Sequence, residues 1–271
     1  MVPRQLRPPG GNPPTRIPVS VGSLADETGA CPDPVIWAYV APKNREAIRL
    51  AVANAAESLL DGAKPGSDHQ LQYARAFANN AVTPAQFDRL KAMLDGAVNG
   101  LTVDAELRWY IFICGVKRGI FGPSEITAEG DRDKTAHGTQ YVAYAHAAIP
   151  TKEAKVAAFK SVTTDDLSNT IHSYKCLGFN ESIHWDLLEG FVDQYFDAIL
   201  KVWETKGYEI AETTATLTFP TWAISEATVT KAQHWLDVTG KDSSNALRRS
   251  VTEGRDAMTR ALKARAVDAT R

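Results

Sequence analysis

The chain has 271 residues, of which 44% are hydrophobic and 23% charged, enough apolar material for a sizeable globular core. Its formal net charge of -2 gives no sign of a nucleic-acid or anionic-membrane partner. The longest apolar run, from Trp109 to Val116, is too short to span a bilayer, so we expect no membrane partner. The three cysteines are odd in number and far apart, which does not suggest a disulfide framework, and no secretory signal is evident. A reducing cytoplasm is therefore the expected location.

Residues 1–42 form the first predicted unit, a proline-rich arm. They hold nine of the fourteen prolines, and no helical or strand period survives at that density. We expect most of this arm to be extended or disordered, with Trp37 and Tyr39 holding its end against the domain. The second unit, residues 43–271, is expected to be helical.

Helical periodicity begins at Asn44, and the first four helices are marked by capping residues and by apolar residues at helical spacing. Their predicted inward residues are Ile48, Val52, Ala55, Leu59 and Leu60 in a helix ending near Gly62; Leu71, Ala74 and Phe77 after a Ser67 cap; Phe87, Leu90 and Leu94 after Thr83 and Pro84; and Leu107, Trp109, Ile111, Phe112 and Val116 between Asp104 and Gly119.

The stretch from Ile126 to Lys155 holds parts of the next three helices and one hard break. Its middle helix presents one apolar face, formed by Tyr141, Val142, Ala145, Ala148 and Ile149. Pro150 cannot continue that helix, because it lacks an amide hydrogen, and Thr151 caps the following one. The result is an αα-hairpin that needs neighbours of the same kind to bury its apolar face.

The second half of the chain continues the helical pattern. We expect an eighth helix from Asp165 or Asp166 to Gly178, then a strongly apolar stretch from Leu187 to Trp203 at the centre of the domain. The run Ile210–Phe219 is rich in β-branched residues and is compatible with a strand, although its context favours a helix. Two more helices are expected at Glu226–Val238 and Ser244–Ala269. Together the elements predict an all-α fold, an irregular HEAT- or armadillo-like α-solenoid of roughly ten or more helices.

The sequence lacks the common catalytic signatures. It contains no HExxH for zinc, no GxxxxGK[ST] for phosphate, no GxGxxG and no GxSxG. Glu181 and His184 form one Glu-x-x-His, whereas a di-iron site needs two copies and two more glutamates. His172 and Cys176 are spaced to supply half of a zinc site, but no second pair follows. We therefore predict no catalytic residue, metal or cofactor in this chain.

The remaining polar candidates have simpler explanations as structural or surface residues. His137 and His146 are interpreted as surface or core histidines. The junction Asp131–Asp133 is favoured as a charged corner between helices over a ligand contact. The last helix is the most basic part of the chain, and its pairs Arg249–Glu253 and Asp256–Arg260 indicate a solvated face. An alternative is that Arg248 and Arg255 present guanidinium groups to a carboxylate.

Seven segments taken in order resemble one known family. They are LLDGAKPGSDHQLQYARAF (59–77), LTVDAELRW (101–109), ITAEGDRDKTAHG (126–138), AAIPTKEAK (147–155), LSNTIHSYKCLGF (167–179), DQYFDAILKVWE (193–204) and LRRSVTEGRDAMTRALKARAVDA (247–269). From about Pro34 onward, the chain resembles the C-terminal helical domain of actinobacterial aminopeptidase N, a domain type also found in the endoplasmic-reticulum aminopeptidases. It departs from the family after Gly178–Phe179, where NESIHWDLL replaces the usual tryptophan and proline.

The resemblance implies a HEAT-like helical bowl that closes over a zinc-bearing catalytic domain and forms one wall of a peptide chamber. The family's HExxH and amino-terminus recognition loop belong to upstream domains, and this sequence contains neither. By position in the matching segments, the resemblance suggests Arg108, Arg132, Arg248 and Arg255 as contacts for the C-terminal side of a peptide.

Three hypotheses follow. The first is a detached or truncated aminopeptidase C-terminal domain, inactive alone, whose partner is a catalytic domain or a peptide. The second is a free-standing helical scaffold that binds a peptide or protein. The third, favoured least, is an independent metalloenzyme that uses His172, Cys176, Glu181 and His184.

Overall fold

The structure is a computed structural model that describes residues 32–270, and every regular element in this range is a helix. Short corners join most of the helices. The elements are α1 (Pro32–Tyr39), η2 (Pro42–Asn44), α2 (Arg45–Gly62), α3 (Asp68–Asn80), α4 (Pro84–Leu94), α5 (Ala105–Val116), α6 (Pro123–Arg132), α7 (Ala136–Ala148), α8 (Lys152–Thr164), α9 (Asn169–Phe179), η3 (Ser182–His184), α10 (Trp185–Leu188), α11 (Phe191–Thr205), α12 (Tyr208–Leu217), α13 (Glu226–Asp237) and α14 (Asn245–Asp268). The predicted all-α class is confirmed.

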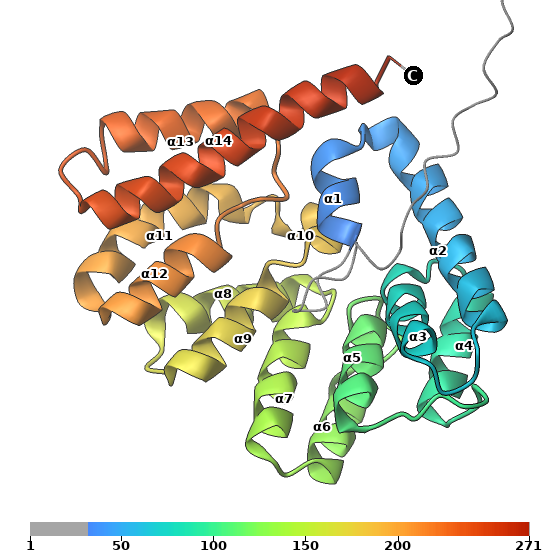
Figure 1. The fold of residues 1–271 in the computed structure, drawn as a ribbon. Coiled ribbons are helices and arrows are strands. Elements are labelled where there is room, and N and C mark those ends of the chain that lie inside the picture. Colours follow the sequence, from blue (N-terminus) through green and yellow to red (C-terminus); the bar gives the residue numbers. More distant parts are fainter. Residues whose placement is uncertain (1–31, 271) are drawn as a thin grey trace, which may run out of the picture.

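The helices form two layers of stacked hairpins (Figure 1). The hairpins are α2–α3, α4–α5, α6–α7, α8–α9, α11–α12 and α13–α14. The second helix of each hairpin contacts the second helix of the next, so that α3, α5, α7, α9, α12 and α14 make one continuous row. The array is curved, and α1 lies between its two ends, against α14 on one side and α2 and α3 on the other. This arrangement is solenoid-like, as predicted.

The core is a series of apolar clusters along the array. One joins α2 to α5 around Phe77 and Leu90, and the next joins α5 to α7 around Trp109. A third lies around Phe159 and Leu188, and the last joins α11 to α14 around Tyr195. Each hairpin thus buries its apolar face against the following one, as the hairpin at Pro150 requires.

The predicted helix starts are confirmed where a short polar side chain precedes the helix. The side-chain oxygens of Ser67, Thr83, Asp104 and Thr151 each accept from the backbone N–H three residues later. At Thr83 the cap is reciprocal, because the Gln86 side chain accepts from the Thr83 N–H at 3.2 Å. Such caps depend on neighbours in the sequence, which is why residue type alone located them.

The region Ile210–Phe219 is helical from Tyr208 to Leu217, as favoured, and the strand alternative is wrong. Its threonines bond within the helix. The hydroxyls of Thr214, Thr216 and Thr218 donate to the carbonyls four residues earlier, at 2.7, 2.6 and 2.7 Å. This back-bonding satisfies the hydroxyls inside a helix, so the β-branched composition does not enforce a strand.

Three details of the predicted elements are wrong. The face that α2 buries is Ala53, Ala56 and Leu60, whereas the predicted Leu59 is 36% exposed. The eighth helix begins after Ser168, whose hydroxyl accepts from the Ile171 N–H, and Asp165 instead follows the end of α8. The stretch Leu187–Trp203 is interrupted: α10 ends at Leu188, and α11 starts only after Gly190, a poor helix former.

The predicted arm differs from the structure in its last residues. Pro32–Tyr39 is helix α1, and Pro42–Asn44 is a 3₁₀ turn. Prolines are tolerated in the first turn of a helix, where the missing amide hydrogen has no intrahelical partner in any case. Trp37 does hold this end to the domain, because its carbonyl accepts from both Arg45 and Arg265. Residues 1–31, the rest of the arm, lie outside the described residues.

Candidate functional site

Arg108, on α5, makes a bidentate ion pair inside the domain. Its Nε and Nη2 donate to the two carboxylate oxygens of Glu129 on α6, at 2.6 and 2.7 Å. Its Nη1 donates to the Leu94 carbonyl at 3.0 Å. The Arg108 side chain is 17% exposed and that of Glu129 is 7% exposed. Because the Arg108 guanidinium already binds a buried carboxylate with two donors, few donors remain to bind a peptide carboxylate.

Arg132, the last residue of α6, is exposed, and its side chain makes no hydrogen bond or ion pair within residues 32–270. It lines a surface pocket of about 380 Å³ together with Arg108 and Lys91. Phe112 and Phe121 also line the pocket, and their rings are stacked with centroids 4.7 Å apart. The pocket therefore combines an aromatic wall with two exposed cations, Arg132 and Lys91, and with the acidic side chains of Asp95 and Glu125.

The two predicted arginines of α14, Arg248 and Arg255, are bound within the C-terminal hairpin. Nη1 of Arg248 lies 2.7, 2.8 and 3.1 Å from the carbonyls of Leu236, Gly240 and Lys241, at the end of α13. Arg255 donates to Asp256 and to the side-chain oxygen of Gln233. The four predicted arginines thus fall into two groups, one at α5–α6 and one on α14, which lie in different parts of the array (Figure 1).

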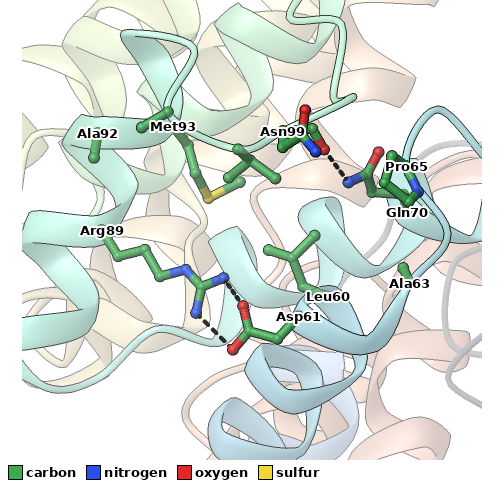
Figure 2. A pocket seen from close by; sticks show the side chains of 11 residues that line it. Leu60, Asp61, Ala63, Pro65, Gln70, Arg89, Ala92, Met93 and Asn99 are labelled. Atoms are coloured by element: carbon green, nitrogen blue, oxygen red, sulfur yellow. Dashed lines mark hydrogen bonds and ion pairs between the residues drawn. The ribbon is translucent and has the colours of Figure 1, made fainter.

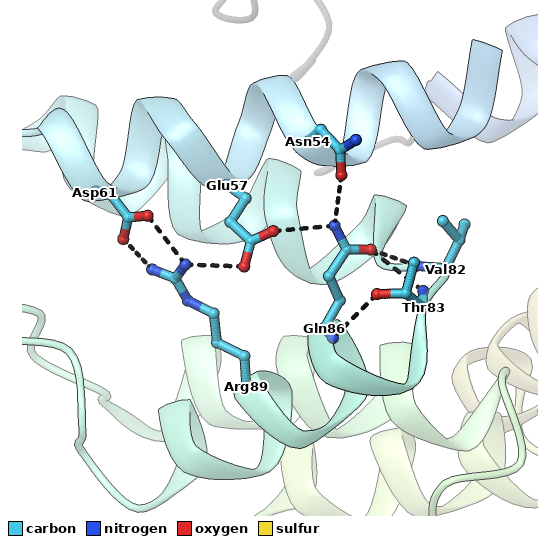
Figure 3. A network of polar contacts seen from close by, with 7 residues as sticks. All are labelled: Asn54, Glu57, Asp61, Val82, Thr83, Gln86 and Arg89. Carbon is cyan, nitrogen blue, oxygen red and sulfur yellow. Dashed lines mark hydrogen bonds and ion pairs between the residues drawn. The ribbon is translucent and has the colours of Figure 1, made fainter. Parts of the chain in front are cut away.

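A polar network that the sequence analysis missed joins α2 to α4 (Figure 3). Nη1 of Arg89 donates to Glu57 at 2.9 Å, and its guanidinium also pairs with Asp61. The hydrogen bonds from Arg89 to Asp61 lower the pKa of the Asp61 carboxyl. The Gln86 amide donates to Glu57 and Asn54 at 3.0 and 3.1 Å. Asn54, Glu57 and Asp61 recur on one face of a helix, a pattern that could have signalled the contact.

Arg89 and Asp61 also border a second surface pocket, of about 320 Å³ (Figure 2). Its apolar lining includes Leu60 and Met93. On the opposite side, the Gln70 amide donates to the Asn99 carbonyl at 2.8 Å. The cationic and anionic groups that border this pocket are paired with each other. The pocket therefore has no unpaired charge with which to recognise a charged ligand.

Lys155 is the other important side chain that sequence reasoning missed. It is completely buried, and its Nζ donates to the carbonyls of Ala147, Gly178 and Phe179, at 2.8, 2.9 and 3.2 Å. These carbonyls belong to the C-terminal ends of α7 and α9, so one ammonium satisfies acceptors of two helices. Burial lowers the pKa of Lys155 to about 7, while the three acceptors favour its charged form.

Glu181 and His184 belong to a buried polar cluster beside Lys155. Glu181 accepts from the Tyr144 hydroxyl and lies 3.4 Å from Nζ of Lys117. Desolvation opposes its charge, but Lys117 and the hydrogen bond outweigh it and hold the pKa of the carboxyl below its ordinary value. Nε2 of His184 donates to the Lys117 carbonyl at 2.7 Å, and burial lowers the pKa of this imidazole to about 4. The Glu-x-x-His pair is therefore part of the packing between helices.

His172 and Cys176 are also engaged internally. Nε2 of His172 lies 3.1 Å from the Val162 carbonyl and 3.0 Å from the Thr214 hydroxyl. The Cys176 sulfur lies 3.8 Å from the imidazole nitrogens, and burial raises the pKa of the thiol to about 12. A thiol that keeps its proton is a poor metal ligand. Within residues 32–270, no three His, Cys, Asp or Glu side chains are grouped to hold a metal ion.

The junction Asp131–Asp133 forms a structural corner between α6 and α7. The Asp133 carboxylate accepts from the Trp109 indole N–H at 2.8 Å and from the Thr135 N–H at 3.0 Å. Asp131 pairs with Lys134 at the surface. His137 and His146 are both exposed, and the partial burial of His146 lowers the pKa of its imidazole. Arg132 stands between Asp131 and Asp133 in the sequence, and it is the candidate arginine that belongs to this corner.

The chain is similar to proteins of known family. Residues 35–260 match the family described as the ERAP1-like C-terminal domain. Over 234 residues, the chain is 42% identical to aminopeptidase N of Streptomyces lividans, an alignment that covers 85% of this chain and 27% of that protein. The chain thus spans about a quarter of the length of this curated relative. None of the helices described for this chain has the length and apolar character needed to cross a membrane.

Proposed function

The chain belongs to the ERAP1-like C-terminal domain family, and from that premise we propose that it encloses a peptide chamber without carrying out the hydrolysis itself. The observation that carries the proposal is the match over residues 35–260 in a sequence that contains no HExxH. In this proposal, the helical array is the wall of a bowl. The partner is the zinc-bearing catalytic domain of an aminopeptidase N-like protein, and the chain holds no cofactor of its own. We also propose a cytoplasmic location, because an odd number of widely spaced cysteines does not suggest a disulfide framework.

The four predicted arginines take different roles in this proposal. We assign the direct peptide contact to Arg132, because its guanidinium is exposed beside a pocket with an aromatic wall. Arg108 shapes the same pocket through its pair with Glu129. Arg248 and Arg255 support the surface from α14 by ordering its contacts with α13. The pocket suits a peptide end that carries an apolar side chain beside a carboxylate.

Two experiments test the proposal. The purified chain should not hydrolyse an aminoacyl-nitroanilide, and hydrolysis that a chelator abolishes would falsify the assignment. The second experiment mixes the chain with the separately expressed catalytic portion of an aminopeptidase N. We expect the mixture to change the hydrolysis of peptides, but not that of a nitroanilide too short to reach the added wall. The variant R132A should reduce the effect on peptides, whereas R260A, which removes an exposed arginine from α14, should not.

A second candidate function is a helical scaffold that binds a peptide or protein without a catalytic partner. It is favoured by residues 1–34, which lie outside the family match. The neighbouring coding sequence separates the two functions. A frame there that encodes HExxH and the rest of an aminopeptidase contradicts the scaffold. If no such frame exists and the chain binds no catalytic domain, the scaffold is the better explanation.

A further inference from the structure

The C-terminal end of α14 holds helix α1, although more than 220 residues separate them in the sequence. The Arg265 guanidinium donates to the carbonyls of Trp37 and Ala38, at 2.6 and 3.0 Å. Its third bond, at 2.9 Å, goes to the Ile224 carbonyl between α12 and α13. The last carbonyls of a helix have no intrahelical partner and lie at the negative end of its dipole. The positively charged guanidinium of Arg265 therefore binds α1 at its C-terminal end, where a cation stabilises the helix most.

A second pair of contacts completes the attachment just beyond α1. Asp268, in the last turn of α14, accepts from the Ala41 N–H at 2.8 Å and from the Asn44 amide at 2.9 Å. Arg45, at the start of α2, donates to the carbonyls of Trp37 and Val40, both at 3.2 Å. Its guanidinium also lies over the Trp37 ring, 4.9 Å from the ring centre. Charged groups from both ends of the array thus converge on the end of α1.

The described side chains of α1, from Val35 onward, contribute little apolar packing by comparison. From residue 35 to 41 only Ile36 and Ala41 are buried, and Val35 and Tyr39 are 49% and 43% exposed. The Trp37 indole N–H is buried and has no hydrogen-bond partner among the described residues, which is unfavourable for the docked helix. An element with little buried apolar surface opens more easily than the core of the domain. The polar contacts therefore decide whether α1 stays docked.

We propose that Arg265 and Asp268 form a latch that holds α1 onto the array as a separately releasable unit. The inference rests on these contacts and does not depend on the proposed function. Docked, α1 bridges α14 to α2 and α3 and covers η3. Released, it uncovers η3 and separates the two ends of the curved array.

Hydrogen–deuterium exchange of the full chain tests the latch. The variant R265M removes the guanidinium and its three hydrogen bonds and keeps the apolar stem. We expect the amides of α1 to exchange at least about tenfold faster, since losing hydrogen bonds from a charged group lowers the free energy needed to open the helix. Exchange in α5, α7 and α9 should not change. R265K, which keeps the charge but loses the fork, should lie between wild type and R265M. D268N should accelerate exchange at Ala41 and at the start of α2.

The matched control is R260M, because Arg260 lies on the same helix, is exposed and makes no hydrogen bond or ion pair in the described structure. It removes the same charge and should leave exchange in α1 at the wild-type rate. Unchanged protection of α1 in both R265M and D268N overturns the proposal. So does equal loss of protection in α1 and in α5 and α7, because α1 is then not a separate unit.

Discussion

The pair Arg108–Glu129 allows a test of how much a buried ion pair contributes to the stability of the domain. Removing one partner of a buried ion pair leaves the other charge without compensation and costs about 3–5 kcal/mol. Arg108 retains some exposure, 17%, and its bond to the Leu94 carbonyl, so we expect E129Q to lower the free energy of unfolding by about 3 kcal/mol. Equilibrium unfolding in urea, followed by circular dichroism, measures the change.

The chain contains its own control for this experiment. Arg249 and Glu253 make a bond of 2.7 Å, but their side chains are 78% and 62% exposed. The same change at the exposed pair, E253Q, should lower stability far less than E129Q does, because solvent screens the interaction. Double-mutant cycles with R108Q and R249Q should show coupling of about 2 kcal/mol at the buried pair and almost none at the exposed one. Equal effects at the two pairs would refute the reasoning from burial.

Two further predictions concern acid sensitivity and helix packing. The pKa of His184 is about 4 when folded and about 6.5 when unfolded, so between these values the unfolded chain binds more protons and stability decreases as the pH is lowered. H184Q keeps a donor for the Lys117 carbonyl but does not titrate. Between pH 6.5 and 5 the wild type should therefore lose roughly 2 kcal/mol of stability that H184Q does not lose, so the difference between the two proteins should shrink by that amount. A difference that stays constant with pH contradicts the burial argument. In G178A, the new methyl group would meet the Tyr144 carbonyl oxygen at 2.3 Å, so the melting temperature should fall by several degrees, about 2–3 kcal/mol of stability. In G62A no atom lies within 4 Å, and stability should stay the same or rise by up to about 1 kcal/mol; equal effects of the two substitutions would exclude close packing of α7 on α9 as the cause.

Features that depend on neighbouring residues could be predicted from the sequence, whereas features that depend on contacts between distant segments could not. Helix caps such as Ser67 and Thr151 depend on residues three positions apart, and they were located correctly. The buried face of α2 depends on which helices pack against it, so Leu59 was wrongly predicted to face inward and Ala56 was not predicted, although the helix itself and the buried Leu60 were. The end of the arm depends on contacts with Arg265, more than 220 residues away, and composition alone suggested no helix there.

The same limit applies to the candidate site. The position of Lys155 in a helix gave no reason to expect an ammonium that satisfies two helix ends, because its acceptors belong to α7 and α9. The pairing of Arg108 with Glu129 joins two helices and was likewise not visible. The resemblance identified the family, but it could not show which arginines already have internal partners.

A curved array of short helices explains why so many arginines are internal. Every short corner ends a helix, and each end leaves up to four carbonyls without intrahelical donors. The guanidinium group carries five donors in a planar fork, so one side chain can satisfy several of these acceptors at once. Arg118 does so for the carbonyls of Asn79, Ala81 and Cys114, in the way that Arg248 and Arg265 serve other corners. Arginine at a helix boundary in such a fold is therefore weak evidence for a ligand. An exposed arginine that has no partner among residues 32–270, such as Arg132, is the stronger candidate.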